Sequence, residues 1–123
     1  MAATEPGQVI EQFTQFFNSG DIEGLVSLYE DGAVFIPTPG TVLSDAAGVR
    51  AGLQGFLDTK GTLTIVSSSA VVKGDLALTH NRWRLDLANG EPMEHTSADV
   101  ARRQPDGTWK YAIDNPYSAE ILD

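Results

Sequence analysis

The sequence predicts an α+β domain in which three N-terminal helices pack on a strongly curved, mainly antiparallel sheet of four to six strands. Three observations predict this class. Apolar residues repeat at helical spacing through residue 57, they alternate with polar residues from residue 62 onward, and short turn sequences separate the later segments. Because 123 residues are enough for one core but not for two, we treat residues 1–123 as a single domain.

The first two predicted helices precede any strand. The apolar face of the first consists of Val9, Ile10, Phe13, Phe16 and Phe17. Thr4 is placed to cap this helix, and Gly20 lies just beyond its end. Asp21 can cap a second helix, which continues through Tyr29 and stops at Asp31-Gly32.

A short strand at residues 33–36 should end at Pro37-Thr38-Pro39-Gly40, since proline cannot donate to a central ladder, and a loop should follow. Ser44 or Asp45 can cap a third helix. Its three glycines each lower helix stability by up to about 1 kcal/mol relative to alanine, so tertiary packing must hold it. These glycines are Gly48, Gly52 and Gly55.

Four longer β segments follow, separated by sequences that favour tight turns. We expect strands over residues 63–72, 76–87, 93–104 and 108–115. Gly74-Asp75, Asn89-Gly90 and Pro105-Asp106-Gly107 lie between them. Short connections make neighbouring strands antiparallel, so the helices and the curved sheet form a cone. The mouth of that cone is the expected place for an apolar pocket.

Composition excludes several kinds of function. There is no cysteine, which rules out disulfides, thiolate metal sites and cysteine nucleophiles. A formal charge of -9 repels phosphate backbones and anionic lipids, so neither nucleic acid nor membrane is an expected partner. No signal peptide, membrane span or cofactor motif is recognisable, and the only histidines, His80 and His95, are predicted on opposite faces. We therefore expect a cytoplasmic protein with no metal and no cofactor.

Alternation along residues 76–87 places Asn81 and Trp83 toward the cone, and Arg82 and Arg84 outward. Trp83 is either core filler or a wall of the pocket. The outward face also carries Leu76 and Leu78, which together with the arginines could mark a subunit contact.

The last two strands carry the acid–base candidates. If His95 and Asp99 face inward, a histidine and a carboxyl group share one side of a strand and can move protons, although periodicity alone does not decide which face points inward. On the final strand, alternation groups Ile113 with Trp109 and Tyr111, opposite to Asp114. Asp114 either borders a void beside Ala112 or caps the end of the strand. Tyr29 is either core or a phenolic donor at the pocket.

Three segments carry a resemblance to a known family. "FFNSGDIEGLVSLYEDGAVFIPTPG", "ALTHNRWRLDLANG" and "SADVARRQPDGTWKYAIDNPYS" resemble the nuclear transport factor 2-like superfamily over nearly the whole chain. That family includes ketosteroid isomerases, SnoaL-like cyclases, limonene-type epoxide hydrolases and scytalone dehydratases, and its cystatin-like fold is the same cone. The resemblance supports the fold strongly and is nearly silent on activity.

The resemblance maps unevenly onto the chain. The ketosteroid isomerase pattern puts Phe13 at the oxyanion tyrosine and Pro37 at the catalytic base, while its remaining aspartate falls on Asp99. The epoxide hydrolase pattern puts one catalytic aspartate on Asp114, but its Arg-x-Asp element falls on Asn81 and Trp83. SnoaL-like cyclases use a cavity histidine and aspartate, types that His95, Asp99 and Asp114 supply.

We therefore expect a cofactor-free acid–base isomerase, cyclase or lyase acting on a small, apolar or polyketide-like carbonyl compound. Its catalytic candidates are Asp99, Asp114 and His95, and its substrate-binding candidates are Asn81, Trp83, Tyr29, Phe13 and Phe17. The alternatives are a non-catalytic ligand-binding or dimerisation domain and, more weakly, an epoxide hydrolase. The family resemblance implies a homodimer that associates through the outer face of the sheet.

Overall fold

Helix α1 (Gly7–Asn18) begins later than expected and without the expected cap. We describe a computed structural model, which covers residues 3–117. Thr4 does not cap the helix, because Pro6 occupies the cap position and makes no side-chain cap bond. Instead the Gln8 side-chain oxygen accepts hydrogen bonds from the Thr4 and Glu5 backbone N–H groups, at 2.8 and 3.2 Å. The side chain of Gln8, in the first turn, therefore binds the backbone that precedes the helix.

The second predicted helix is shorter than its apolar pattern. Asp21 caps α2 (Ile22–Ser27) as expected, accepting from the Gly24 N–H at 2.9 Å. The helix does not continue to Asp31, since Tyr29 already begins strand β1 (Tyr29–Thr38). The Tyr111 N–H donates to the Leu28 carbonyl at 2.8 Å, so pairing with a distant strand replaces the next helical turn.

Strand β1 is longer than predicted and forms a hairpin where a loop was expected. It continues through Pro37 to Thr38 and pairs antiparallel with β2 (Thr41–Leu43). Gly40 has a φ of +87° in the connecting turn, a backbone conformation that glycine accepts without strain. The edge strand β2 therefore lies within the segment that the prolines had suggested was irregular.

The third helix begins where its cap predicts. Asp45 accepts from the Gly48 N–H at 2.6 Å at the start of α3 (Ala46–Leu57). Val49 and Leu53 are buried, and Gly52 lies against the ring of Phe35 in β1. Tertiary packing therefore holds this glycine-rich helix, as the sequence required.

The four later β segments form the expected hairpins, with one of them divided. The strands are β3 (Thr62–Lys73), β4 (Leu76–Asp86), β5 (Met93–Thr96), β6 (Ala98–Arg103) and β7 (Trp109–Asn115). The predicted strand over residues 93–104 is interrupted only at Ser97, and both of its halves pair with β4. Gly74 and Gly107 adopt positive φ in the turns on either side of these strands.

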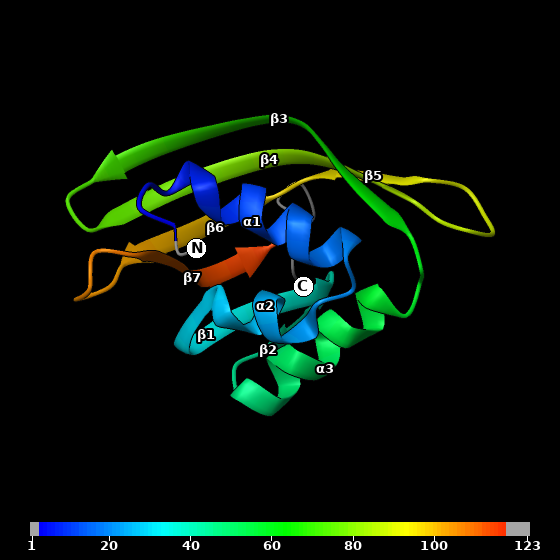
Figure 1. The fold of residues 1–123 in the computed structure, drawn as a ribbon, viewed down its shortest axis with the longest axis horizontal. Helices are drawn as coiled ribbons and strands as arrows, with labels where there is room; N and C mark the ends of the chain where they lie inside the picture. The colour runs from blue at the N-terminus through cyan, green and yellow to red at the C-terminus, as the bar shows by residue number, and fades with distance from the viewer. Residues whose placement is uncertain (1–2, 118–123) are drawn as a thin grey trace.

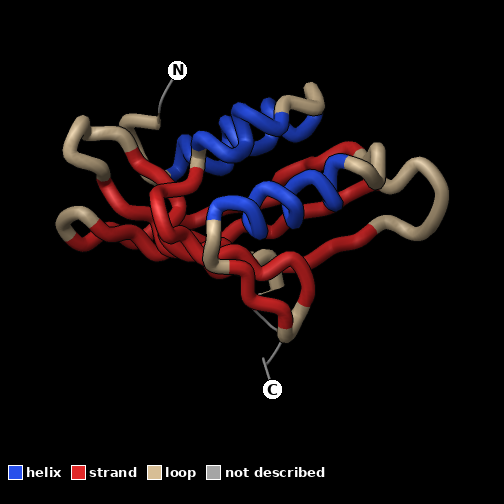
Figure 2. Tube along the Cα trace, turned by 90° about the horizontal axis from the view of Figure 1, so that it is seen from below, coloured by secondary structure: helices blue, strands red, loops and turns tan. Residues whose placement is uncertain are grey.

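All three helices lie on one side of the sheet (Figures 1 and 2). Within residues 3–117 the sheet has seven strands in the order β2-β1-β7-β6-β4-β3, with β5 beside β4. β1 and β7 pair in parallel, which the succession of hairpins did not predict. The predicted fold class is confirmed: an α+β domain with three helices on a curved, mostly antiparallel sheet that is not closed. The predicted number of four to six strands was too low for the described residues, because β2 forms where a loop was expected and residues 93–104 divide into β5 and β6. None of the helices in this part of the chain is long and apolar enough to cross a membrane.

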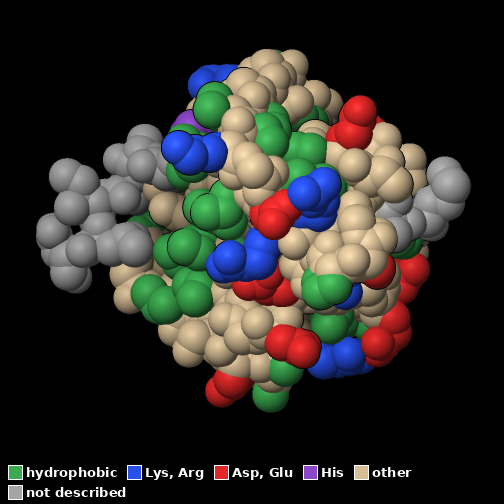
Figure 3. Space-filling view, turned by 90° about the vertical axis from the view of Figure 1, so that its left-hand side faces the viewer, with side chains coloured by type: hydrophobic (Ala, Val, Ile, Leu, Met, Phe, Trp, Pro, Cys, Tyr) green, Lys and Arg blue, Asp and Glu red, His purple; other side chains and the backbone are tan. Residues whose placement is uncertain are grey.

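The outer face of the sheet carries an exposed apolar row. Val71, Leu78, Val100 and Ile113 lie opposite one another across β3, β4, β6 and β7. Leu78 and Ile113 are 45% and 41% exposed. Figure 3 faces the end of the molecule with the β3–β4 and β6–β7 turns, where apolar side chains gather beside lysine and arginine side chains.

Candidate functional site

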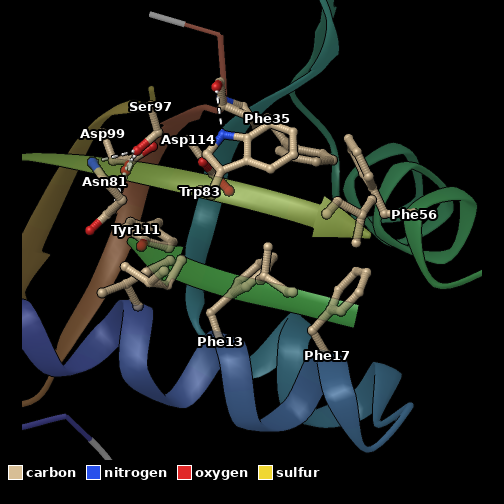
Figure 4. Close-up of a pocket in the computed structure, with 15 residues that line it drawn as sticks. Phe13, Phe17, Phe35, Phe56, Asn81, Trp83, Ser97, Asp99, Tyr111 and Asp114 are labelled. Atoms are coloured by element: carbon tan, nitrogen blue, oxygen red, sulfur yellow. Dashed lines mark hydrogen bonds between the residues drawn. The ribbon is translucent and has the colours of Figure 1, made fainter. Parts of the chain in front are cut away.

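A cavity of about 60 Å³ lies between the helices and the concave face of the sheet (Figure 4). This volume is larger than one water needs. Most of the wall is apolar, and the polar groups are confined to one end, on β4, β6 and β7. The lining side chains that recur below are Phe13, Phe17, Phe35, Phe56, Trp83, Asn81, Ser97, Asp99, Tyr111 and Asp114.

Strand alternation explains most of the polar end. Asn81 lies opposite Ser97 and Thr79 opposite Asp99 in the antiparallel β4–β6 ladder, so these four side chains share the concave face. This answers the question that periodicity left open, because the face of residues 93–104 that contains His95, Ser97 and Asp99 is the inward one.

Asp114 reaches the same face through a β-bulge. Val100 pairs with Ile113, whereas Ala101 pairs with Tyr111, so Ala112 is an extra residue in β7. The extra residue shifts the alternation by one position. Tyr111 and Asp114 consequently both line the cavity, and Ile113 points outward. The predicted grouping of Ile113 with Tyr111 was wrong for this reason.

Asp99 is 1% exposed and accepts hydrogen bonds at both carboxyl oxygens. Its Oδ2 accepts from Ser97 Oγ at 2.8 Å and from Asn81 Nδ2 at 3.1 Å. Its Oδ1 accepts from the Asn115 N–H at 3.2 Å. Polar neighbours therefore fix the orientation of this carboxyl group on several sides.

Asp114 lies directly opposite Asp99 on the neighbouring strand and is 6% exposed. The hydroxyl of Tyr29, at the start of β1, donates a hydrogen bond to Asp114 Oδ2. Asp114 also shares a side-chain hydrogen bond with Asp99. Both carboxyl groups line the cavity.

The two carboxyl groups perturb each other. Burial, together with the nearby charge of Asp114, raises the pKa of Asp99 well above its ordinary value. Burial also raises the pKa of Asp114, while hydrogen bonds from Asp99 and Tyr29 act in the opposite direction. The two directions indicate that the pair shares a proton, which Asp99 holds more strongly than Asp114.

Two of the predicted substrate-binding residues have other contacts. Asn81 was expected to donate to a substrate oxygen, but its amide nitrogen already donates to Asp99 and to Ser97 Oγ. The Tyr29 hydroxyl donates its hydrogen bond to Asp114, and Tyr29 does not line the cavity. Both side chains therefore position the carboxyl pair.

His95 lies apart from the carboxyl groups. It sits opposite Trp83 on β5, with its ring centroid 5.4 Å from that of Trp83 and 4.9 Å from that of Tyr117. It is not among the residues that line the cavity. The hypothesis that His95 relays a proton to Asp99 therefore has no support in this geometry.

The apolar wall contains the predicted aromatic residues. Phe13 and Phe17 of α1 are stacked with ring centroids 6.2 Å apart. Trp83 faces them from β4, and its indole N–H donates to the Pro116 carbonyl at 2.8 Å. Trp83 is therefore both a buried packing residue and part of the cavity wall.

Charged groups other than the two aspartates are absent from the described lining of the cavity. Arg84 and Asp86, which spell the Arg-x-Asp element of epoxide hydrolases, form an exposed ion pair at 2.9 Å. Nor do the described residues contain a group of three or more histidine or carboxylate side chains placed to hold a metal ion. The arrangement suits proton transfer by carboxyl groups.

Two polar cavity residues were not among the predicted site residues. Ser97 follows from the inward face once Asp99 is placed there, so a firmer assignment of that face would have found it. Tyr111 was grouped away from Asp114, because alternation takes no account of the bulge at Ala112. No signal at the residue level marks that bulge, although the small alanine is compatible with it.

Comparison with known families agrees with this architecture. A family model described as a SnoaL-like domain matches residues 10–112. The chain belongs to the SnoaL-like domain family. Its fold is similar to that of solved structures described as NTF2-like and as having a cystatin-like fold. No curated protein matches the chain.

Three solved structures illustrate the similarity of fold. A protein of unknown function from Mycobacterium tuberculosis has a TM-score of 0.76 and 18% identity, covering 88% of this chain and 66% of its own. A candidate ketosteroid isomerase from Shewanella frigidimarina has a TM-score of 0.78 and 16% identity, covering 89% and 91%. A candidate dehydratase of the NTF2-like family from Streptomyces avermitilis has a TM-score of 0.70 and 23% identity, covering 88% of both chains.

Proposed function

We propose that this SnoaL-like domain is a cofactor-free acid–base enzyme, an isomerase, cyclase or lyase, acting on a small and largely apolar carbonyl compound. One observation carries the proposal: two buried, facing carboxyl groups, Asp99 and Asp114, line a cavity whose other walls are mostly apolar. Such a pair lowers the stability of the fold, since burial disfavours the charged form of each carboxyl group. A pair of this kind is characteristic of sites that transfer protons.

The proposed roles follow from the different surroundings of the two groups. Asp114 is the proton acceptor, because its pKa is raised less strongly than that of Asp99 and its side chain lines the cavity. It removes a proton from the carbon next to the substrate carbonyl, which leaves an enol or enolate. Returning that proton to another carbon completes an isomerisation, and expelling a β-substituent completes an elimination.

Asp99 is a positioning residue that stabilises the charged form of Asp114. Its carboxyl group, protonated because of burial, donates a hydrogen bond to the Asp114 carboxylate on the neighbouring strand. Ser97 and Asn81 fix the orientation of Asp99, and Tyr29 fixes that of Asp114. The likeness to a candidate isomerase and a candidate dehydratase supports this reaction class, because both reactions begin with proton removal beside a carbonyl or hydroxyl group.

Exchange of hydrogen for deuterium tests the proposal without knowledge of the natural substrate. Small apolar ketones are incubated with the protein in D₂O, and deuterium at the carbon next to the carbonyl is measured by mass spectrometry. We expect catalysed exchange for at least one ketone, and a loss of about 10²–10⁴-fold in Asp114→Asn. Asp99→Asn should also slow exchange, whereas Asp86→Asn, an exposed aspartate on the same sheet, should not.

A ligand-binding domain without catalysis is the second candidate, and one observation favours it. Every oxygen of Asp99 already accepts hydrogen bonds from the protein, as expected for a carboxyl group with a purely structural role. In that case a ketone would raise the thermal unfolding temperature by mass action and no exchange would be seen. That result would reject the enzyme and support the binding domain.

A further inference from the structure

A second cavity, of about 180 Å³, lies beside the first, between the start of α1 and strands β3 and β4. Gly7, Ser68 and Thr79 contribute to its wall. Ile10, Asn81 and Tyr111 line both cavities, so the two spaces meet at these side chains. Ser68 is exposed although it pairs with Asn81 on the concave face, because α1 does not cover this part of β3.

The hydroxyl of Tyr111 has no hydrogen-bond partner within residues 3–117, although the side chain is only 2% exposed. Every fully enclosed polar side-chain atom of these residues does have a partner. The Tyr111 hydroxyl is therefore not enclosed by protein, and it opens into the cavities that the residue lines (Figure 4). An unpaired buried hydroxyl is costly unless something else satisfies it.

Asn81 places an acceptor next to this donor. Its amide nitrogen is directed to Asp99 and Ser97, which turns the amide oxygen toward α1 (Figure 4). The first turn of α1 has no acidic side chain, so the partial positive charge at the helix start is not neutralised there. The Tyr111 hydroxyl and the start of α1 suit an uncharged ligand oxygen that accepts a hydrogen bond, and the Asn81 oxygen suits a ligand hydroxyl that donates one.

We propose that the second cavity is the polar compartment of a single ligand site, in which the Tyr111 hydroxyl donates to a carbonyl or hydroxyl oxygen of the ligand. The apolar body of the ligand then lies among the phenylalanines of the first cavity, and its oxygen-bearing end lies beside α1. This inference rests on the proposed function, since it names the substrate class for the same site. Burial and the nearby aspartates raise the pKa of Tyr111, so the phenol keeps its proton for donation.

A matched pair of probes tests the role of Tyr111. 4-Phenylbutan-2-one and butylbenzene share a carbon skeleton and differ in the carbonyl oxygen. Dissociation constants for both are measured by calorimetry with the wild-type protein and with Tyr111→Phe. We expect the substitution to weaken binding of the ketone about fivefold, the worth of one neutral hydrogen bond, and to leave butylbenzene unchanged. Equal effects on both probes, or no measurable binding of the ketone to the wild type, would overturn the proposal.

Two neighbouring serines test the second cavity itself. Ser68 lines it, whereas Ser67 pairs with Arg82 on the outer face. Ser68→Leu should weaken binding of the ketone at least fivefold. Ser67→Leu should leave that binding unchanged. An equal affinity of the ketone for the wild type and Ser68→Leu would show that the second cavity is not used.

Failure of this inference differs from failure of the proposed function. Suppose that Tyr111→Phe and Ser68→Leu lower affinity for the ketone but the wild type never exchanges deuterium into it. The proposed polar compartment is then supported and the proposed enzymatic activity is rejected. If the wild type catalyses exchange and both variants bind and exchange the ketone as the wild type does, the proposed enzymatic activity is supported and the proposed compartment is rejected. Thermal unfolding of each variant checks that the fold is intact.

Discussion

Asp99 and Asp114 face each other because two strands place them there, and each is buried by the chain around it. An isolated buried carboxylate is costly, so such groups take up a proton or acquire donors. In this domain both solutions are used. Asp99 is surrounded by donors and its pKa is raised, which favours its protonated form, and Asp114 accepts a hydrogen bond from the Tyr29 hydroxyl.

This pair makes stability depend on pH in an unusual direction. Because the folded-state pKa of both groups is raised, the folded protein binds more protons than the unfolded chain above the ordinary aspartate value of about 4. The free energy of unfolding should therefore fall as pH rises from about 4 through the folded-state pKa values. Most paired aspartates give the opposite trend.

Asp114→Asn should weaken this dependence. The new amide can accept from Tyr29 through its oxygen and donate to Asp99 through its nitrogen, and it removes a carboxyl group whose charged form is disfavoured by burial. We expect the free energy of unfolding at pH 7 to rise, because the cost of holding a buried carboxylate is removed. Urea unfolding between pH 4 and pH 8 measures it. A fall in stability at pH 7 would contradict the assignment.

At the scale of the helix, α3 contains two glycines in contrasting surroundings. A Cβ at Gly52 would meet the ring of Phe35 at 2.9 Å, whereas a Cβ at Gly55 would meet nothing within 4 Å. Gly55→Ala should stabilise the protein by up to about 1 kcal/mol through helix propensity. Gly52→Ala should destabilise it despite the same gain, since the Phe35 ring must move.

Comparison of the two thermal unfolding temperatures checks this pair of variants. If both substitutions stabilise the protein, the packing of α3 on Phe35 leaves room for a Cβ at Gly52, which contradicts the close approach in the structure. Because Phe35 also lines the cavity, Gly52→Ala should in addition alter ligand affinity, and Gly55→Ala should not.

Local signals predicted the elements better than their pairing. Asp21 and Asp45 located two helix starts, and the glycine turns located the hairpins. The end of α2 and the length of β1 depend on pairing with β7, some 80 residues later, which no local pattern contains. Likewise the inward position of Asn81 and Trp83 followed from alternation, whereas Tyr111 depended on a bulge that alternation cannot reveal.

At the scale of the whole molecule, the exposed apolar row on the outer face of the sheet suits a second copy of the chain. Its neighbouring charges are already paired, Arg82 with Glu94 and Arg102 with Glu30, so two such faces would not repel each other strongly. We expect a homodimer at micromolar concentration by sedimentation velocity. Leu78→Lys should convert it to a monomer, while Val42→Lys, on the edge strand β2, should not.

A monomeric wild type at this concentration would reject the dimer. The sequence identified Leu76 and Leu78 as outward residues but not the complete row, because alternation grouped Ile113 with Tyr111, which lies on the inner face. The same bulge at Ala112 therefore determines both the inner site and the outer surface.

The parallel pairing of β1 with β7 also has a consequence for biosynthesis. A ribosome makes Thr38 long before Trp109, and at about 5–20 residues per second the interval is roughly 4–14 s. Throughout this time the backbone groups of β1 on its β7 side have no partner strand. Newly made chains should therefore depend on chaperones during this interval.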